Sequence, residues 1–265
     1  MAAMTSLPLV KGRAPGRRAA PPRAFDTPED AEGGPQAERL RDLRARFGHL
    51  GAEALLDKMI RDAFPGRIAV VSSFGSESVV LLHLVARIDP STPVLFLNTG
   101  KLFPETLRYR DRLQDALGLT DLRALHPHPE DERTLDPDGV LWNANPDACC
   151  EFRKVLPLRR ALKSFDAQIT GRKRFQTGAR KAMQTIELSE GTFKINPLAD
   201  WSLERLAAWI DGHKLPKHPL VRDGYPSIGC MPCTERVQPG DDYRSGRWAG
   251  FGKDECGLHT DGGGI

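Results

Sequence analysis

The chain lacks any long apolar run. No stretch of its 265 residues approaches the roughly 20 uninterrupted apolar residues that span a bilayer, and no signal-peptide core precedes a cleavage site. We therefore expect no membrane partner and a cytoplasmic location. An odd number of cysteines, five, with metal-type spacing also fits a reducing compartment better than a secreted disulfide scaffold.

The sequence also lacks a strong net charge of either sign. Its 38 Lys and Arg residues stand against 35 Asp and Glu residues, which leaves a net charge of +3. No global cationic field demands nucleic acid, so we expect no nucleic-acid partner. Homo-oligomerisation is left open by these numbers.

Cysteine is scarce and unevenly placed. Cys149 and Cys150 are adjacent, Cys230 and Cys233 enclose two residues, and Cys256 stands apart. Four thiolates in two close pairs are the soft ligands that zinc or an iron–sulfur cluster prefers. Adjacent side chains diverge, which favours an extended cluster, whose irons lie apart, over a single tetrahedral zinc. Buried thiols or disulfides are the alternative, because free cysteine is often buried.

Beyond the first 35 residues, short apolar segments alternate with helical patterns. The segments 68–71, 94–97 and 167–170 read as buried strands, and helices are expected at 52–64, from 79 onward and at 103–117. This alternation predicts an α/β fold, a parallel twisted sheet with helices on both faces. Ligands of such sheets bind beyond the carboxyl ends of the strands.

Two polar loops follow the first two predicted strands. Small residues at a strand-to-helix junction present backbone N–H groups at the positive end of the helix dipole, which predicts an anion site. The same residue types are ordinary in turns and helix caps, so their position carries the prediction. The candidate substrate-binding residues of the loops are Ser73, Phe74, Gly75, Ser76, Glu77, Leu97, Asn98, Thr99 and Gly100.

Cationic residues are expected near the same place. Lys154 lies one helical turn after Cys150, so it can reach the space beside the metal centre. Arg172 and Arg174 follow the third predicted strand within a basic run, 172–180. Such a run can be a solvated surface or an RNA-binding patch. At the end of a parallel strand it is better placed to face the anion that the loops bind.

Three motifs together resemble the assimilatory adenylyl-sulfate reductases, close relatives of the phosphoadenylyl-sulfate reductases: Cys149-Cys150, Cys230-x-x-Cys233 and the Glu-Cys-Gly-Leu-His segment at 255–259. The resemblance covers everything after the N-terminal tail. It implies an adenine nucleotide alpha hydrolase-like fold and one 4Fe-4S cluster held by the four paired cysteines. Family members without the pairs mostly use the 3′-phosphorylated substrate, so the pairs point to adenylyl sulfate.

The first loop is similar to the PP-loop of this fold, and 97–100 resembles the family's Leu-Asp-Thr-Gly segment. Phe74 and Gly75 stand where ATP pyrophosphatases carry two glycines, and Glu77 stands where they carry an aspartate. These departures favour nucleotide holding over ATP cleavage. Asn98 replaces the usual aspartate, so no charge-dependent role is assigned to it.

The resemblance also assigns roles to residues of the site. Lys154 matches the family lysine that links cluster and substrate sulfate, and Arg244 and Arg247 match residues that hold the sulfate. Cys256 is the expected nucleophile, because a thiolate suits attack on the electrophilic sulfur of adenylyl sulfate. His259 either assists this thiolate or is an exposed polar residue.

The implied activity is the reduction of adenylyl sulfate to sulfite and AMP, within sulfate assimilation and cysteine biosynthesis. It passes through an S-sulfocysteine on the enzyme and uses thioredoxin as reductant. A reaction of this kind explains why a nucleophile would sit on a mobile segment, which first meets the substrate and is later offered to another protein.

We expect three regions: a disordered tail at 1–35, a nucleotide-binding and cluster-binding reductase domain at 36–233, and a mobile segment at 234–265 that carries Cys256. The tail is rich in Arg, Gly, Ala and Pro without apolar periodicity. A transit peptide is the second interpretation of its composition.

Other functions fit parts of the pattern. A phosphoadenylyl-sulfate reductase or a dual-specificity enzyme would share every motif. An ATP-dependent tRNA sulfurtransferase with a PP-loop would use the basic run for RNA. A nonenzymatic nucleic-acid module would use the four paired cysteines for structural zinc.

Overall fold

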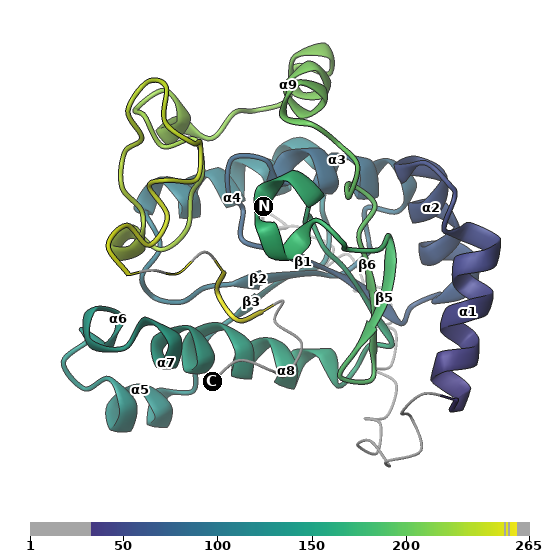
Figure 1. Ribbon diagram of the computed structural model, residues 1–265, viewed down its shortest axis with the longest axis horizontal. Helices are drawn as coiled ribbons and strands as arrows, with labels where there is room; N and C mark the ends of the chain where they lie inside the picture. Colours follow the sequence, from purple (N-terminus) through teal and green to yellow (C-terminus); the bar gives the residue numbers. More distant parts are fainter. Residues whose placement is uncertain (1–32, 252, 254, 259–265) are drawn as a thin grey trace, which may run out of the picture.

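A computed structural model of the chain describes residues 33–251, 253 and 255–258, so His259 lies outside the described residues. At its centre is one six-stranded sheet with the strand order β3-β2-β1-β4-β6-β5 (Figure 1). The strands are β1 (Ile68–Ser72), β2 (Val94–Leu97), β3 (Leu122–Leu125), β4 (Ala167–Ile169), β5 (Ile186–Ser189) and β6 (Thr192–Ile195).

The predicted α/β fold with a parallel sheet is confirmed, with one strand as an exception. β1 pairs in parallel with β2 and β4, and β3 and β6 extend the sheet in parallel on either side. β5 instead runs antiparallel to β6 at the edge. Glu190 and Gly191 join these two strands with φ of 48° and 67°. Two left-handed residues form the tight turn of a hairpin, so the strands must be antiparallel.

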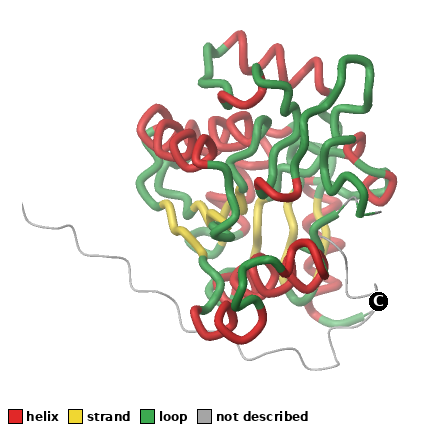
Figure 2. The backbone as a smooth tube through the Cα atoms, turned by 90° about the vertical axis from the view of Figure 1, so that its left-hand side faces the viewer, coloured by secondary structure: helices red, strands yellow, loops and turns green. Residues whose placement is uncertain are grey.

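Two apolar cores lie on opposite faces of the sheet, because successive side chains of a strand alternate in direction. The larger core joins β1, β2, β4, β5 and β6 to α1 (Pro35–Phe47), α2 (Ala52–Asp57), α3 (Ser78–Ile88), α4 (Pro104–Leu117) and α9 (Leu203–Gly212). The smaller core consists of Ala69, Leu95, Leu97, Leu158 and Phe165. Figures 1 and 2 show the resulting helix–sheet–helix layers.

Leu158 belongs to α8 (Leu156–Leu162), which covers the second face together with three short helices, α5 (Pro129–Leu135), α6 (Leu141–Ala144) and α7 (Pro146–Cys150) (Figure 1). A π-helical segment, Glu151–Val155, separates α7 from α8. Pro157 has no N–H to donate to the carbonyl of Arg153, which disrupts the regular α-helical ladder there. The helix predicted at 52–64 is also divided, into α2 and a π-helical segment, Lys58–Ala63, although it contains no proline.

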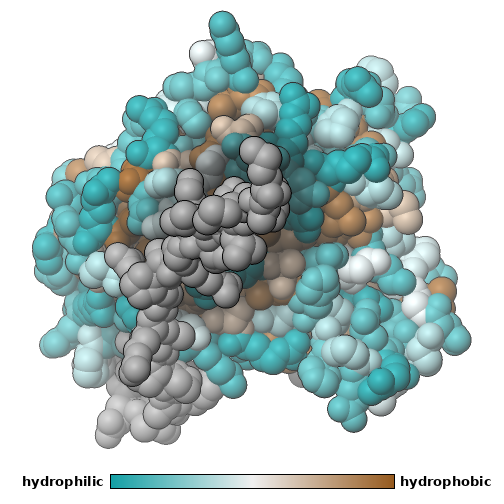
Figure 3. Space-filling view, turned by 180° about the vertical axis from the view of Figure 1, so that it is seen from behind, coloured by the Kyte–Doolittle hydropathy of each residue, from teal (hydrophilic) through white to brown (hydrophobic). Residues whose placement is uncertain are grey.

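After β6 the chain passes through α9 and two 3-10 helices, Pro219–Val221 and Met231–Cys233, and its described C-terminal residues return across the sheet domain (Figure 1). The division at 35/36 and 233/234 stays a prediction. No helix in the described ranges is both long and apolar enough to cross a bilayer. The face seen in Figure 3 is mostly hydrophilic, with hydrophobic residues in smaller areas between the polar ones.

His218 fastens this returning segment to α4. Its ring is 2% exposed, and its Nδ1 accepts from the Leu220 N–H at 3.3 Å. The proton of the neutral ring therefore lies on Nε2, which donates to Thr106 Oγ1 at 3.1 Å. The nearby Tyr109 hydroxyl donates to the Pro216 carbonyl at 2.7 Å. Burial lowers the pKa of His218 from 6.5 to about 4.

This pKa predicts an acid-dependent loss of stability. Because the folded-state pKa lies below the unfolded value, the unfolded chain binds the proton more readily. The stability that His218 contributes is complete above pH 6.5 and is lost as the pH falls toward 4. Between pH 7 and pH 5 we expect this group to lower the free energy of unfolding by about 2 kcal/mol in urea titrations. His218→Gln should remove this pH dependence of the free energy of unfolding. His49→Gln, at an exposed position, should retain it.

Candidate active site

A cavity of about 200 Å³ opens beyond the carboxyl ends of β1, β2 and β4. Its walls come from the loops after these strands, the start of α3, Lys154, the segment 227–230 and the C-terminal residues Arg244, Arg247, Trp248, Glu255, Cys256 and Leu258. The cavity therefore lies where a ligand of a parallel sheet is expected.

The loop after β1 forms one wall. Phe74 adopts a left-handed φ of 51°, which is strained for a bulky residue, and its N–H donates to Ser72 Oγ at 3.1 Å. Its side chain is fully buried and meets Phe96 edge to face at 5.3 Å. The turn thus places an apolar anchor in the core, while Ser73, Gly75, Ser76 and Glu77 line the cavity at the start of α3.

The loop after β2 is joined to the second cysteine pair. Thr99 Oγ1 lies 3.3 Å from Cys230 Sγ and accepts from the Lys101 N–H at 3.2 Å, so its own proton is available to the sulfur. Leu102 forms a β-bridge with Cys230, and the Met231 N–H donates to the Lys101 carbonyl at 2.7 Å. These contacts fix the Cys230–Cys233 turn against the carboxyl end of the sheet.

The four paired cysteines are buried, free of disulfides and close enough to affect one another's charge. Their exposed fractions lie between 6% and 8%. Burial, and next the charge of Cys150, raises the pKa of Cys149 to about 11. Burial also raises the pKa of Cys150 and Cys233. Within the described ranges no three His, Cys, Asp or Glu side chains converge at distances that suit one metal ion.

Lys154 and Arg247 are cations that lie beside this cysteine group. Burial alone would lower the pKa of Lys154, but negative charge on Cys230, Cys150 and Cys256 raises it above its ordinary value. Burial and the neighbouring Arg244 lower the pKa of Arg247, which still remains a guanidinium cation. Lys154 Nζ and the Arg247 guanidinium lie 5.9 Å and 4.3 Å from the ring centroid of the buried Trp248. The indole thus supports both cations in the cavity wall.

Gly229 is required by the position of Arg247. A Cβ atom at residue 229 would lie 2.3 Å from one guanidinium nitrogen of Arg247. The guanidinium therefore lies directly against the backbone of the segment that leads to Cys230.

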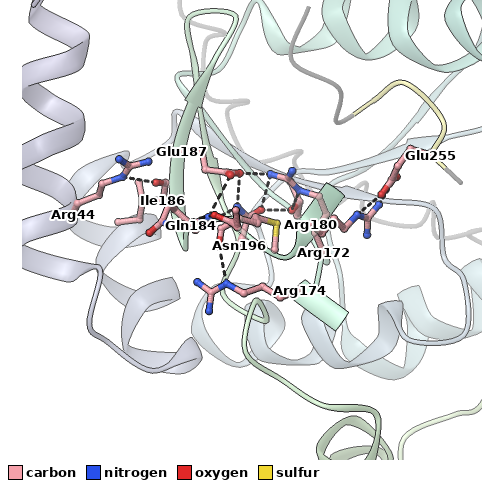
Figure 4. A network of polar contacts seen from close by, with 12 residues as sticks. Arg44, Arg172, Arg174, Arg180, Gln184, Ile186, Glu187, Asn196 and Glu255 are labelled. Carbon is pink, nitrogen blue, oxygen red and sulfur yellow. Dashed lines mark hydrogen bonds and ion pairs between the residues drawn. The ribbon is translucent and has the colours of Figure 1, made fainter. Parts of the chain in front are cut away.

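Each cation of the basic run meets a carboxylate. Arg172 donates to Glu187 at 2.5 Å and to Asn196 at 3.1 Å, and Lys173 pairs with Glu77. Arg174 pairs with Asp200 and donates to the Met183 carbonyl at 2.7 Å. Arg180 pairs with Glu255. Figure 4 shows part of this network, with Arg172 beside Glu187 and Asn196, and Arg180 beside Glu255.

Cys256 is partly buried and lines the cavity together with Lys154, Arg244 and Arg247. Its sulfur shares an apolar contact group with Cys230, Cys233 and Trp248. The fifth cysteine therefore lies beside the paired cysteines although more than twenty residues separate it from Cys233.

The structure brings together most of the residues that the sequence predicted. The cavity is lined by Ser73, Gly75, Ser76, Glu77, Leu97, Thr99, Lys154, Arg172, Cys230, Arg244, Arg247 and Cys256. The described residues that line it do not include Phe74, Asn98, Gly100 or Arg174. Cys149, Cys150 and Cys233 are near Cys230 but do not line the cavity, and His259 lies outside the described residues.

Lys173 and Arg180 also line the cavity, as members of the basic run that was expected to face the anion. Sequence reasoning gave no role to Gln176 or Glu255, which line it as well. Both stand beside assigned residues, but no pattern in the sequence indicates which distant side chain each one meets.

Comparison with known proteins gives consistent matches. The profile of the family described as "Phosphoadenosine phosphosulfate reductase domain" matches residues 67–236. The chain is 47% identical over 243 residues to a protein of Mesorhizobium japonicum named adenosine 5′-phosphosulfate reductase, covering 92% of this chain and 95% of that protein. It is 49% identical over 222 residues to a protein of the same name from Chelativorans sp., covering 83% and 91%.

A solved structure shares the fold. The phosphoadenylyl-sulfate reductase from Candida auris, crystallised as a phosphate complex, is similar with a TM-score of 0.63 and 26% sequence identity. The similarity covers 76% of this chain and 97% of that chain.

The contact at Gly229 generates a prediction for anion binding. Gly229→Ala should push the Arg247 guanidinium out of the cavity wall and weaken binding of inorganic sulfate by roughly tenfold in calorimetric titrations, the cost of one charge-assisted contact. Gly212→Ala is the matched control, because a Cβ there meets no atom within 4 Å. Equal sulfate affinity in the two variants would contradict the role given to Arg247.

Proposed function

Because the chain belongs to the phosphoadenosine phosphosulfate reductase family, we propose that it reduces adenosine 5′-phosphosulfate to sulfite and AMP in assimilatory sulfate reduction. One observation carries the proposal: Cys256 lies in the same cavity as Lys154, Arg247 and the loop that precedes α3. This arrangement supports a role for Cys256 as nucleophile, for Lys154 and Arg247 as its cationic surroundings, and for the loop as an anion site.

In the first half-reaction, the Cys256 thiolate attacks the sulfur(VI) atom of the substrate. A sulfur–sulfur bond forms, the bond from sulfur to the bridging phosphate oxygen breaks, and AMP leaves with that electron pair. Two anions must approach each other, so Lys154 and Arg247 lower the repulsion between thiolate and sulfate. Arg244, which also lines the cavity, adds a third cation.

In the second half-reaction, a dithiol protein of the thioredoxin type supplies two electrons. One of its thiolates attacks the sulfur of Cys256 and displaces sulfite, and its second thiol resolves the mixed disulfide. The reductant leaves as a disulfide, and Cys256 returns to the thiol form. A reducing compartment, such as the cytoplasm, suits this step.

The four paired cysteines fit a 4Fe-4S cluster as resident cofactor. Buried soft sulfurs without disulfides are the donor set that such a cluster takes, and ligation would keep them deprotonated despite burial. When bound, the cluster would be held by Cys149, Cys150, Cys230 and Cys233 and would supply a fixed charge beside Lys154. Lys154 itself remains the group that faces both this charge and the substrate sulfate.

The basic run supports adenosine 5′-phosphosulfate over its 3′-phosphorylated form. Arg172, Lys173, Arg174 and Arg180 each contact a carboxylate already. A 3′-phosphate would have to displace one of these carboxylates and leave it without a cation.

Sulfite release with thioredoxin tests this choice of substrate. We expect catalytic efficiency with adenosine 5′-phosphosulfate to exceed that with the 3′-phosphorylated compound by at least about tenfold, or roughly 1.4 kcal/mol. Equal efficiencies would instead establish a dual-specificity enzyme. ATP-dependent AMP formation on tRNA, without sulfite, would favour the sulfurtransferase alternative.

Purification without oxygen tests the cofactor. The protein should be brown and contain iron and inorganic sulfide, because adjacent cysteines suit a cluster better than a lone ion. Cys233→Ser should lose iron, sulfide and most of the activity. Stoichiometric zinc without sulfide, in protein expressed with sufficient iron, would contradict the assignment.

Two substitutions separate the chemical roles in the site. Cys256→Ser should retain iron and bind nucleotide yet release no sulfite, since a hydroxyl is a far weaker nucleophile than a thiolate. Lys154→Ala should keep Cys256 available but slow sulfite release by roughly 100-fold, the usual loss for one positioned charged contact. Turnover by Cys256→Ser would identify another nucleophile.

A further inference from the structure

We infer that the ion pair between Glu255 and Arg180 is a latch that seats Cys256 in the cavity and has to open before a protein reductant reaches its sulfur. The inference rests on the proposed function and adds two positioning residues to it. Glu255 is the neighbour of Cys256 in the chain, whereas Arg180 belongs to the sheet domain, after β4.

The pair combines one hydrogen bond with a second close contact between the charged groups. Arg180 Nη2 donates to Glu255 Oε2 at 2.6 Å, and Arg180 Nε lies 2.5 Å from Oε1. The Thr177 hydroxyl donates to Oε1 at 3.0 Å. The Arg180 and Glu255 side chains are 11% and 10% exposed, so solvent screens their attraction less than it screens a surface pair. Figure 4 shows the two side chains pointing at each other from separate parts of the chain.

Arg180 is the fixed half of the latch. It also donates to Gln176 Oε1, and Gln176 Nε2 donates to Glu77 Oε2 at 2.9 Å. Glu77 in turn accepts from the buried Lys173. This chain of contacts holds the guanidinium in place from the loop that precedes α3.

The segment that carries Cys256 has other contacts with the rest of the protein. Leu258 packs against the smaller core and is partly buried. Lys253, which is 9% exposed, pairs with Asp147, whose side chain is 83% exposed. In the Glu255–Arg180 pair both side chains are shielded from solvent, and its opening frees the residue next to the nucleophile.

A latch has opposite effects on the two half-reactions. Closed, it holds the Cys256 sulfur beside Lys154 and Arg247, which favours attack on the substrate. Closed, it also keeps this sulfur partly buried, away from a large partner. Weakening the pair should therefore slow the formation of S-sulfocysteine without slowing its reduction, and should expose the thiol to small reagents.

Glu255→Gln tests the inference in the holoenzyme, because the substitution keeps the shape and removes the charge. Alkylation of Cys256 by iodoacetamide, located by peptide mass, should become roughly five- to tenfold faster. Adduct formation from adenosine 5′-phosphosulfate in a single turnover should slow by a similar factor, while sulfite release from preformed adduct by thioredoxin should not slow. Arg180→Gln should behave alike, and the double variant E255R/R180E should move alkylation back toward wild type.

Glu53→Gln is the matched control, since it also removes a glutamate carboxylate from an ion pair with arginine, the exposed Arg87–Glu53 pair. It should change none of the rates of alkylation, adduct formation and sulfite release. An unchanged alkylation rate in Glu255→Gln would overturn the latch, and so would equal slowing of both half-reactions. If the wild type forms no adduct at all, the proposed function fails, whereas alkylation still reports on the latch.

Discussion

The site depends on the junction between the loop after β2 and the Cys230–Cys233 turn. Thr99 contacts the Cys230 sulfur at 3.3 Å, and Leu102 pairs with Cys230 through its backbone. This junction turns the C-terminal part of the chain back over the carboxyl end of the sheet. The junction thereby brings Arg247, Trp248 and Cys256 to the cavity that the loop between β1 and α3 also lines. That loop lies more than one hundred residues earlier in the sequence.

The cations around the cavity can be explained by the anionic groups that the site has to bind. Sulfurs in buried positions and an anionic substrate both need cations, and a cation without an anion is unfavourable there as well. Thiolate charge raises the pKa of Lys154 against the effect of burial, so sulfurs and lysine stabilise one another's ionised forms. The cations farther out, from Arg172 to Arg180, are held by carboxylates of the protein itself. The cations of the basic run thus have carboxylate partners, whereas Lys154 faces the sulfurs.

The sequence was most informative where local pattern and chemistry coincide. β1, β2 and β4 are short apolar runs and were located within a residue of their ends, and the cysteine spacing separated Cys256 from the two pairs. β3 was not identified, because this edge strand is only partly buried and gives no continuous apolar run. The β5–β6 hairpin was also missed, since its turn, Glu190-Gly191, is not one of the strong hairpin dipeptides.

The sequence did not predict which carboxylate each cation of the basic run contacts, for a different reason. Arg172, Lys173 and Arg174 are consecutive, yet each meets a carboxylate from a different place in the chain: Glu187, Glu77 and Asp200. Composition cannot distinguish them, because the choice is made by tertiary packing around an irregular loop. The same holds for Glu255, whose partner Arg180 lies 75 residues away.

Mass measurement of the protein after reaction tests the central claim most directly. Wild-type holoenzyme incubated with adenosine 5′-phosphosulfate, in the absence of any reductant, should gain one sulfonate group on the peptide that carries Cys256. The added mass should disappear, with stoichiometric release of sulfite, when thioredoxin is supplied. An adduct on a different residue, or sulfite formation without any adduct, would contradict the account.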